Sequence, residues 1–252
     1  MDIIFFIVIG GLWGSFANVC IYRLPINKNI AFGRSFCTNC KKKIAWFDNI
    51  PVLSYLILRS KCRNCKKKIS FQYFLVELLG ILNFTVIYLL FGITLTTILL
   101  IILSLAFLII FFIDLRHYII PNSITYPMMI LGFIKSFDPN LNSIFPNYIN
   151  SLIGGIFGYA MIWSIIYFYK QIKKKDGMGL GDAKLFAVIG FWFGWISIPF
   201  IIFLSSIIAL IYVLPDLLKN SKKMSSQIPF GPFIIIGTIF YLVFQDYFVQ
   251  LL

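Results

Sequence analysis

The chain has 252 residues, of which 60% are hydrophobic and only 12% are charged. A water-soluble domain is roughly half apolar and about a quarter charged, so this composition excludes an ordinary soluble fold and indicates a membrane protein. The net charge of +13 could indicate a nucleic-acid partner. Basic residues gathered on one side of a bilayer explain it better, so no nucleic-acid partner is expected.

Eight apolar segments are predicted to cross the membrane as helices, because a helix satisfies its backbone hydrogen bonds internally. The expected fold class is an all-α polytopic membrane protein with about eight transmembrane helices and a small cytoplasmic, zinc-ribbon-like loop domain. In chain order the segments are Ile3–Ile21, Leu75–Phe91, Thr94–Ile113, Ile119–Phe137, Ser151–Tyr169, Ala183–Trp195, Ile198–Leu214 and Phe230–Val249. The expected domains are residues 1–22, a first transmembrane helix; 23–74, a four-cysteine loop domain; and 75–252, a seven-helix membrane core.

The basic residues predict the orientation of these helices. With the N-terminus placed outside, every Lys and Arg except Lys135 lies in or beside an inside connection. Cytoplasmic loops carry such an excess of positive charge. The sequence therefore predicts that both termini lie outside and that the loop domain lies in the cytoplasm.

Two cysteine pairs in the loop domain have the spacing of a four-thiolate metal site. Cys37 and Cys40 form the first pair, and Cys62 and Cys65 follow after 21 intervening residues. The segments 37–44 and 62–69 are identical except for Thr38 against Arg63, which indicates two matching turns that face one ion. We favour structural zinc over disulfides, because a cytoplasmic loop is in a reducing compartment. Cys20, alone in the first span, is expected to be a small buried residue.

Three acidic residues are expected at membrane depth or at its edge, where an ionisable group is costly and indicates function. Asp114 ends the third span and Asp182 begins the sixth, so both are expected at the cytoplasmic end. Two carboxyls at one depth could activate water and protonate a leaving amine, as in an aspartic protease. Alternatively, Asp182 could be a helix N-cap and Asp114 a partner of Arg116. Glu77 could pair with a lysine or shape the pocket.

Several motifs give the chain a resemblance to the bacterial type IV prepilin leader peptidases. They are GSFANVCIYRLP (14–25), the two cysteine pairs, IDLRHYIIPN (113–122), GMGLGDAKL (177–185) and IPFGPF (228–233). Each is weak by itself, but together they follow one order along nearly the whole chain. Residues 75–252 would then be a membrane protease core.

The resemblance implies that Asp114 and Asp182 are catalytic. Further support for the substrate pocket is expected from Gly179, Gly181, Lys184 and Glu77. The glycines before Asp182 would let the backbone approach substrate closely or adopt a positive φ. The implied reaction removes the basic leader of prepilins and pseudopilins after a glycine at the cytoplasmic face of the bacterial inner membrane.

The resemblance also implies a second reaction, because members with the cysteine loop often N-methylate the new terminal residue with S-adenosylmethionine. The expected cofactors are therefore structural zinc on Cys37, Cys40, Cys62 and Cys65, and S-adenosylmethionine. Two alternatives stay open: a presenilin-like protease with the same chemistry, and a non-enzymatic transporter or scaffold with a zinc-binding loop.

Overall fold

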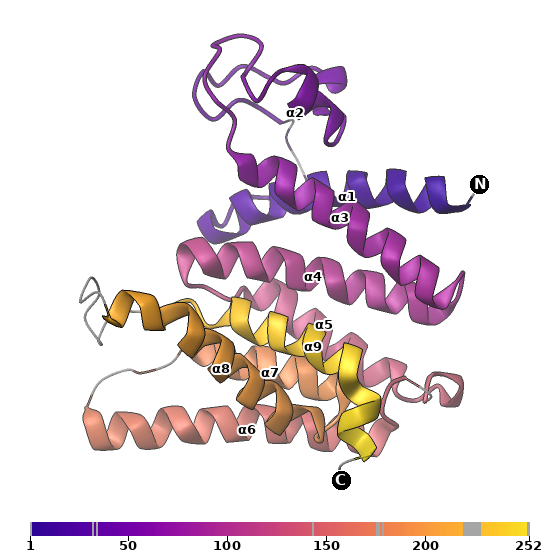
Figure 1. Ribbon diagram of the computed structural model, residues 1–252, viewed down its shortest axis with the longest axis vertical. Coiled ribbons are helices and arrows are strands. Elements are labelled where there is room, and N and C mark those ends of the chain that lie inside the picture. The colour runs from indigo at the N-terminus through magenta and orange to yellow at the C-terminus, as the bar shows by residue number, and fades with distance from the viewer. Residues whose placement is uncertain are drawn as a thin grey trace. The chain divides into compact units, whose positions relative to one another are not determined.

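The computed structural model describes residues 2–31, 33, 35–142, 144–174, 177, 179–218 and 228–250 (Figure 1). The chain folds as two compact units, Met1–Ile109 and Ile110–Leu252. The division falls within one long helix, α4, which runs over Leu95–His117. The three domains expected from the sequence stay a prediction.

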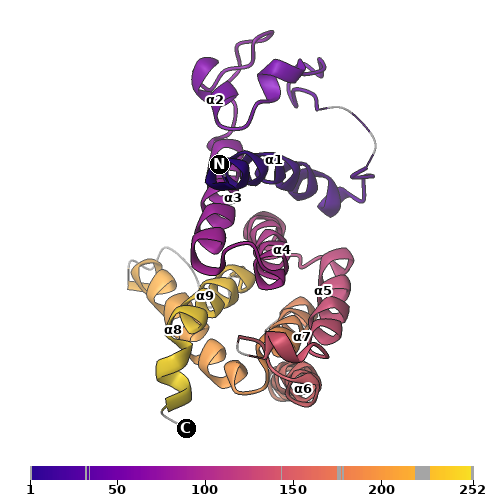
Figure 2. The ribbon, with the colours of Figure 1, turned by 90° about the vertical axis from the view of Figure 1, so that its right-hand side faces the viewer.

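Helices account for most of the described residues. In the first unit they are α1 (Asp2–Arg23), η1 (Leu24–Ile26), η2 (Trp46–Asn49), α2 (Leu53–Ile57) and α3 (Phe71–Phe91). After α4 the second unit contains α5 (Asn122–Lys135), η3 (Pro139–Leu141), α6 (Tyr148–Lys173), α7 (Leu180–Phe193), α8 (Ser197–Leu218) and α9 (Gly231–Gln250). Figure 2 gives a second view of the same elements.

The all-α membrane fold class is confirmed. Each predicted span overlaps one helix, and the described residues form isolated bridges but no β-strand. Five helices, α1, α3, α4, α6 and α8, are long and apolar enough to cross a bilayer, and α9 has a shorter apolar stretch, Gly231–Gln245. α5 and α7 have only 14 residues each, about 21 Å of helix.

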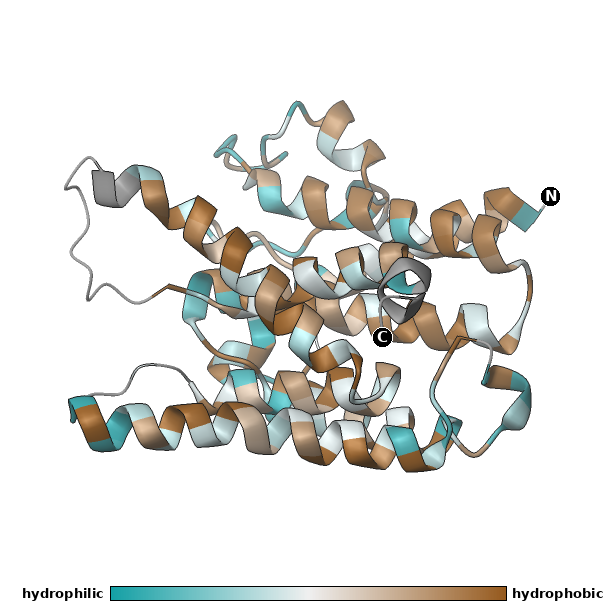
Figure 3. Ribbon diagram, turned by 60° about the horizontal axis from the view of Figure 1, so that its bottom comes forward, coloured by the Kyte–Doolittle hydropathy of each residue, from teal (hydrophilic) through white to brown (hydrophobic). Residues whose placement is uncertain are grey.

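Apolar residues run along the length of the helices, as the hydropathy colours of Figure 3 show, and many of their side chains are exposed. Leu90 is 69% exposed, Phe203 is 65% exposed and Val243 is 69% exposed. Such surfaces are unfavourable in water but match the hydrocarbon of a bilayer. The chain is a multi-pass membrane protein.

In the first unit, α1 and α3 pack closely because glycines face each other. A Cβ atom added at Gly10 would lie 2.7 Å from the carbonyl oxygen of Gly80, and one at Gly14 would lie 2.8 Å from the Cα of Glu77. Farther along, the rings of Phe6 and Tyr88 stack with centroids 4.3 Å apart. Small residues of this kind let helix backbones approach each other in membranes.

In the second unit, α6 and α7 make a similar glycine contact. A Cβ atom at Gly154 or at Gly190 would overlap the backbone of the opposite helix. The adjacent side chains Phe186 and Trp192 of α7 are both fully buried. α7 is therefore the central helix of this unit, and the close backbone contact fixes its position.

The last turn of α7 is satisfied by polar side chains from its neighbours. Ser151 of α6 donates to the carbonyl oxygen of Phe191 at 2.7 Å, and the buried ammonium of Lys135 donates to that of Trp192 at 3.2 Å. The same ammonium lies 3.9 Å from the ring centroid of Phe145. These contacts replace water at a helix end that is buried in the protein.

The α6–α7 contact leads to a testable prediction. Gly154→Leu should destabilise the protein by about 1–3 kcal/mol or more, because the added side chain has no space. Ala160→Leu is the matched control, since Ala160 is exposed on the same helix. Thermal unfolding in detergent, followed by circular dichroism, measures both. Equal melting temperatures for the two variants would contradict the close packing.

Candidate active site and metal centre

The two aspartates expected to be catalytic are both buried in the second unit. Asp114, in the last turns of α4, is 5% exposed, and Asp182, in the first turn of α7, is 8% exposed. Asp114 exerts an electrostatic effect on Asp182, so the fold brings the two carboxyls within range of each other. A buried pair of this kind is costly and indicates a functional site.

Asp114 is held by the beginning of α9. Its Oδ2 accepts a buried hydrogen bond from the backbone N–H of Gly231 at 2.9 Å. A Cβ atom at Gly231 would lie 2.8 Å from the same oxygen, so a larger residue would push the carboxyl away. The first N–H groups of a helix have no partner within it and attract an anion. Within the part of the chain that the structure describes, Asp114 makes no ion pair with Arg116.

Asp182 is held by the beginning of its own helix. Gly179 is the N-cap of α7 and Asp182 lies three residues later, so the alternative that Asp182 is itself the N-cap is wrong. The backbone N–H of Gly179 donates to Oδ2 of Asp182 at 3.3 Å. The backbone N–H of Asp182 donates in turn to the carbonyl oxygen of Gly179 at 3.1 Å. The Asp182 side chain thus supplies its half of a capping box, which fixes the direction of the carboxyl.

The residues expected to support the pocket have different surroundings. A Cβ atom at Gly181 would lie 3.0 Å from the Cβ of Ile120, and Gly179 has a φ of −80°. Neither glycine has the positive φ that was one of their two expected roles. The other role, a close approach of the backbone, is seen for Gly181, but the approach is to Ile120 of the protein itself. Lys184 donates to Oδ1 of Asn122 at 2.7 Å and so connects α7 to α5.

Glu77 lies in the first unit, whereas the two aspartates lie in the second. Its Oε2 accepts a hydrogen bond from the backbone N–H of Val52 at 2.7 Å. Its predicted role in supporting the peptidase pocket stays a prediction. No individual role is predicted for Gly231, Ile120 or Asn122 from sequence, although all three lie in motifs that carry the resemblance.

The four loop cysteines come together as two matching turns. Their sulfur atoms all lie within 4.8 Å of one another, and those of Cys37 and Cys65 are 3.9 Å apart. In each turn the N–H of the first cysteine bonds to a carbonyl five residues later, at 3.0 Å for Cys37 and 2.9 Å for Cys62. All the cysteines are free thiols. Four thiols this close can hold one metal ion.

Hydrogen bonds around the sulfur atoms favour the binding of a metal ion. The backbone N–H of Lys67 and the side-chain amide of Asn39 lower the pKa of the Cys65 thiol to about 6. Metals bind the thiolate form. Asn39 also accepts from Lys67 at 2.9 Å, so it connects the first turn to the second.

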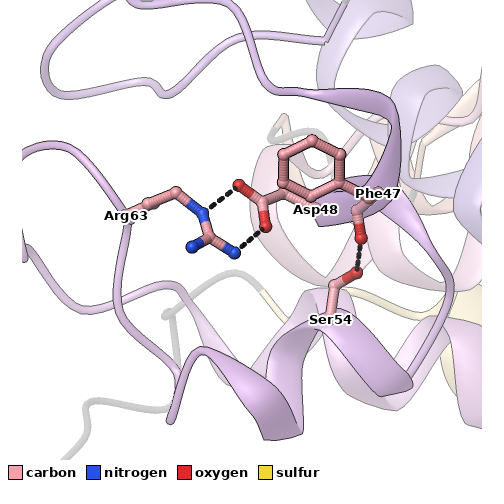
Figure 4. Close-up of polar contacts among 4 residues, drawn as sticks. All are labelled: Phe47, Asp48, Ser54 and Arg63. Atoms are coloured by element: carbon pink, nitrogen blue, oxygen red, sulfur yellow. Dashed lines mark hydrogen bonds and ion pairs between the residues drawn. The ribbon is translucent and has the colours of Figure 1, made fainter.

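An ion pair fastens the second turn to the rest of the loop domain (Figure 4). Arg63 donates from Nε to Oδ2 of Asp48 at 2.8 Å and from Nη2 to Oδ1 at 2.6 Å. The hydrogen bonds from Arg63 hold the pKa of Asp48 below its usual range. Beside it, Ser54 donates to the carbonyl oxygen of Phe47 at 3.0 Å.

The structure thus defines a class: a multi-pass helical membrane protein with a pair of buried, backbone-held carboxyls and a four-cysteine loop. Comparison with known families agrees. Residues 8–91 match the bacterial peptidase A24 N-terminal domain, and residues 100–214 match the type IV leader peptidase family. The chain belongs to the type IV leader peptidase family, whose members are aspartic proteases. It is therefore an enzyme, and the transporter or scaffold alternative is wrong.

Several curated relatives cover nearly the whole chain, and each is named prepilin leader peptidase/N-methyltransferase. The Vibrio cholerae protein is 38% identical over 246 residues, covering 94% of this chain and 94% of its own length. The Pseudomonas aeruginosa protein is 32% identical, covering 95% and 89%, and the Aeromonas salmonicida protein is 32% identical, covering 92% and 87%. No solved structure matches the chain.

The Asp48–Arg63 pair leads to a pH prediction. Because the pKa of Asp48 is lowered in the folded state, its stabilisation is present above the ordinary carboxyl pKa, about 3.9, and is lost as pH falls through the lowered value. Arg63→Met should therefore lower the melting temperature at pH 7, and its difference from wild type should shrink below about pH 4. Arg59→Met is the control. A difference that is constant with pH would contradict this assignment.

Proposed function

We propose that this enzyme removes the short basic leader of type IV prepilins and pseudopilins, cutting after a glycine, and then N-methylates the new terminal residue. The observation that carries the peptidase proposal is the buried pair Asp114 and Asp182, each held by a backbone N–H group. The names of the relatives, prepilin leader peptidase/N-methyltransferase, support both reactions.

Peptide hydrolysis by this pair requires one carboxyl protonated and the other ionised. The ionised carboxylate takes a proton from a water molecule, whose oxygen attacks the carbonyl carbon of the scissile bond. The protonated carboxyl gives its proton to the leaving nitrogen as the C–N bond breaks. A close pair favours such unequal protonation, because two adjacent carboxyls do not both ionise readily.

The backbone hydrogen bonds have a defined part in this mechanism. Gly231 and Gly179 each occupy Oδ2 of one aspartate. The residues described here supply no other hydrogen bond to the two carboxyls, so the second oxygen of each is left for water and substrate. Groups that are held before the reaction need no reorganisation during it.

The proposed location of the reaction is the cytoplasmic face of the bacterial inner membrane, with both termini outside. The concentration of basic residues in alternate connections supports this orientation. A prepilin whose hydrophobic helix lies in the bilayer would present the bond before that helix at the membrane edge. Substrate would thus reach the carboxyls without leaving the membrane.

The proposed metal of the cysteine loop is structural zinc. Ligands about 2.3 Å from a tetrahedral ion lie about 3.8 Å from one another, and the Cys37–Cys65 separation of 3.9 Å fits this. All four positions of the ion would be occupied by Cys37, Cys40, Cys62 and Cys65. A closed site of this kind supplies folding energy rather than catalysis.

Substitution of the two aspartates tests the peptidase proposal. Asp114→Asn and Asp182→Asn should each lower the rate of prepilin cleavage in membranes by about 100-fold or more, since asparagine cannot transfer the proton. Asp138→Asn is the matched control. Asp138 caps η3 and is not one of the buried pair, and asparagine is an equally good cap. Insertion of every variant is checked by protease protection. Wild-type cleavage by either active-site variant would refute its catalytic role.

Metal analysis tests the zinc proposal. Protein purified without chelators should contain a single zinc ion per chain, and Cys62→Ser should lose it because three thiolates bind zinc more weakly than four. Cys20→Ser should retain the zinc, since Cys20 is buried in α1 away from the cluster. Elemental mass spectrometry measures the content. Wild-type protein without zinc would overturn the assignment.

A further inference from the structure

The first unit contains a cavity of about 590 Å³ that the proposed peptide hydrolysis does not use. α1 and α3 form its helical side, and the cysteine loop forms the rest. Pockets for small molecules have volumes of about 300–1,000 Å³. The cavity therefore has the size of a ligand site.

A buried acceptor in this cavity lacks a donor. Asn18 lines the cavity and is 4% exposed. Its Nδ2 donates to the carbonyl oxygen of Tyr73 at 3.0 Å, whereas its Oδ1 has no hydrogen-bond partner among the described residues. Buried polar atoms in proteins are nearly always paired. The orientation of this amide thus leaves an acceptor that a donor on a bound molecule can use.

A carboxylate is fixed on the same side of the cavity. Glu77 lines the cavity, and its Oε2 accepts from the N–H of Val52 at 2.7 Å. Val52 has φ 63° and ψ −52°, and the N–H of Leu53 bonds to the carbonyl oxygen of Pro51 at 2.6 Å. This is a strained γ-turn centred on a β-branched residue, a conformation that is rare. Such strain is concentrated at ligand sites and switches.

Aromatic rings and lysines complete the lining. Tyr22 and Phe36 both line the cavity, with ring centroids 6.3 Å apart, and they are 39% and 36% exposed. Exposed aromatic faces stack on flat rings and attract cations. The loop side carries Lys42, Lys43, Lys67 and Lys68. The helical side thus offers the acceptors and Tyr22, whereas the loop side offers Phe36 and most of the positive charge.

We propose that this cavity binds S-adenosylmethionine, the methyl donor, an inference that rests on the proposed methylation. The molecule has a purine with an N–H donor, a sulfonium and an ammonium cation, and a carboxylate. Asn18 would accept from a donor N–H, Glu77 and the aromatic pair would face the cations, and the lysines would face the carboxylate. This assigns Glu77 to methyl-donor binding.

The transfer itself balances without any further reagent. The lone pair of the substrate's new terminal amine forms a bond to the methyl carbon, and the S–C bond breaks with its electron pair kept by sulfur. The sulfonium becomes a neutral thioether, and the amine releases one proton to water. The chain's own residues need only bind the two partners.

Direct binding of S-adenosylhomocysteine, the demethylated product, tests the inference without turnover. Isothermal titration calorimetry is carried out on the full chain in detergent with zinc present. Asn18→Leu and Tyr22→Leu should each weaken binding about tenfold, the loss expected from one contact. The matched controls, Asn83→Leu in α3 and Tyr159→Leu in α6, lie outside the cavity lining and should bind as wild type does.

Two outcomes overturn the inference: wild-type protein that does not bind S-adenosylhomocysteine, and cavity variants that bind as tightly as the controls. Tyr22→Leu keeps the test decisive if Asn18→Leu does not fold, because Tyr22 is half-exposed. Prepilin cleavage by wild-type protein is measured on the same preparation. Binding that the cavity variants do not weaken defeats the cavity assignment alone, whereas cleavage without any binding defeats the proposed methylation with it. Binding without cleavage defeats the peptidase proposal alone.

Discussion

The second unit depends on one constraint, that a short helix surrounded by apolar material must have its end groups satisfied by other parts of the protein. Water is absent from the hydrocarbon, and an unpaired backbone group there costs several kcal/mol. α7 meets this constraint at its start through Gly179 and Asp182 and at its end through Ser151 and Lys135. Its middle is locked to α6 by glycines. The position of the Asp182 carboxyl and the stability of the membrane fold thus depend on the same helix.

The same constraint explains how Asp114 can be buried. The N–H groups at the start of α9 need an acceptor, and the carboxyl of Asp114 needs donors. The hydrogen bond from Gly231 meets both needs. A residue at the end of one helix and a glycine at the start of another, 117 positions apart in sequence, therefore stabilise each other.

Much of this architecture could be predicted from local patterns. Apolar runs give the helices, and the cysteine repeat gives the paired turns, because each depends on neighbouring residues. The contacts that position the carboxyls could not be predicted in this way. Gly231 is recognisable only once α9 lies against α4. The sequence predicts Lys135 near the outer end of a span, and nothing in that pattern shows that it is buried and satisfies the end of α7. Nothing local shows that Oδ1 of Asn18 lacks a donor.

The paired cysteine turns have a consequence for how the enzyme responds to its environment. Each turn includes a lysine with a left-handed backbone, Lys41 with φ 57° and Lys66 with φ 58°, which is unfavourable for a residue other than glycine. Each turn supplies only two sulfur ligands, so a single ion would have to bind both turns. The free energy of that binding would have to offset the backbone strain of both turns. Cys37 and Cys62 also line the cavity of the first unit, whereas the aspartate pair belongs to the second unit. On the proposed assignments of the zinc and of the methyl donor, a cell short of zinc would process pilin subunits but leave them unmethylated. The ratio of the two products would then record its metal supply.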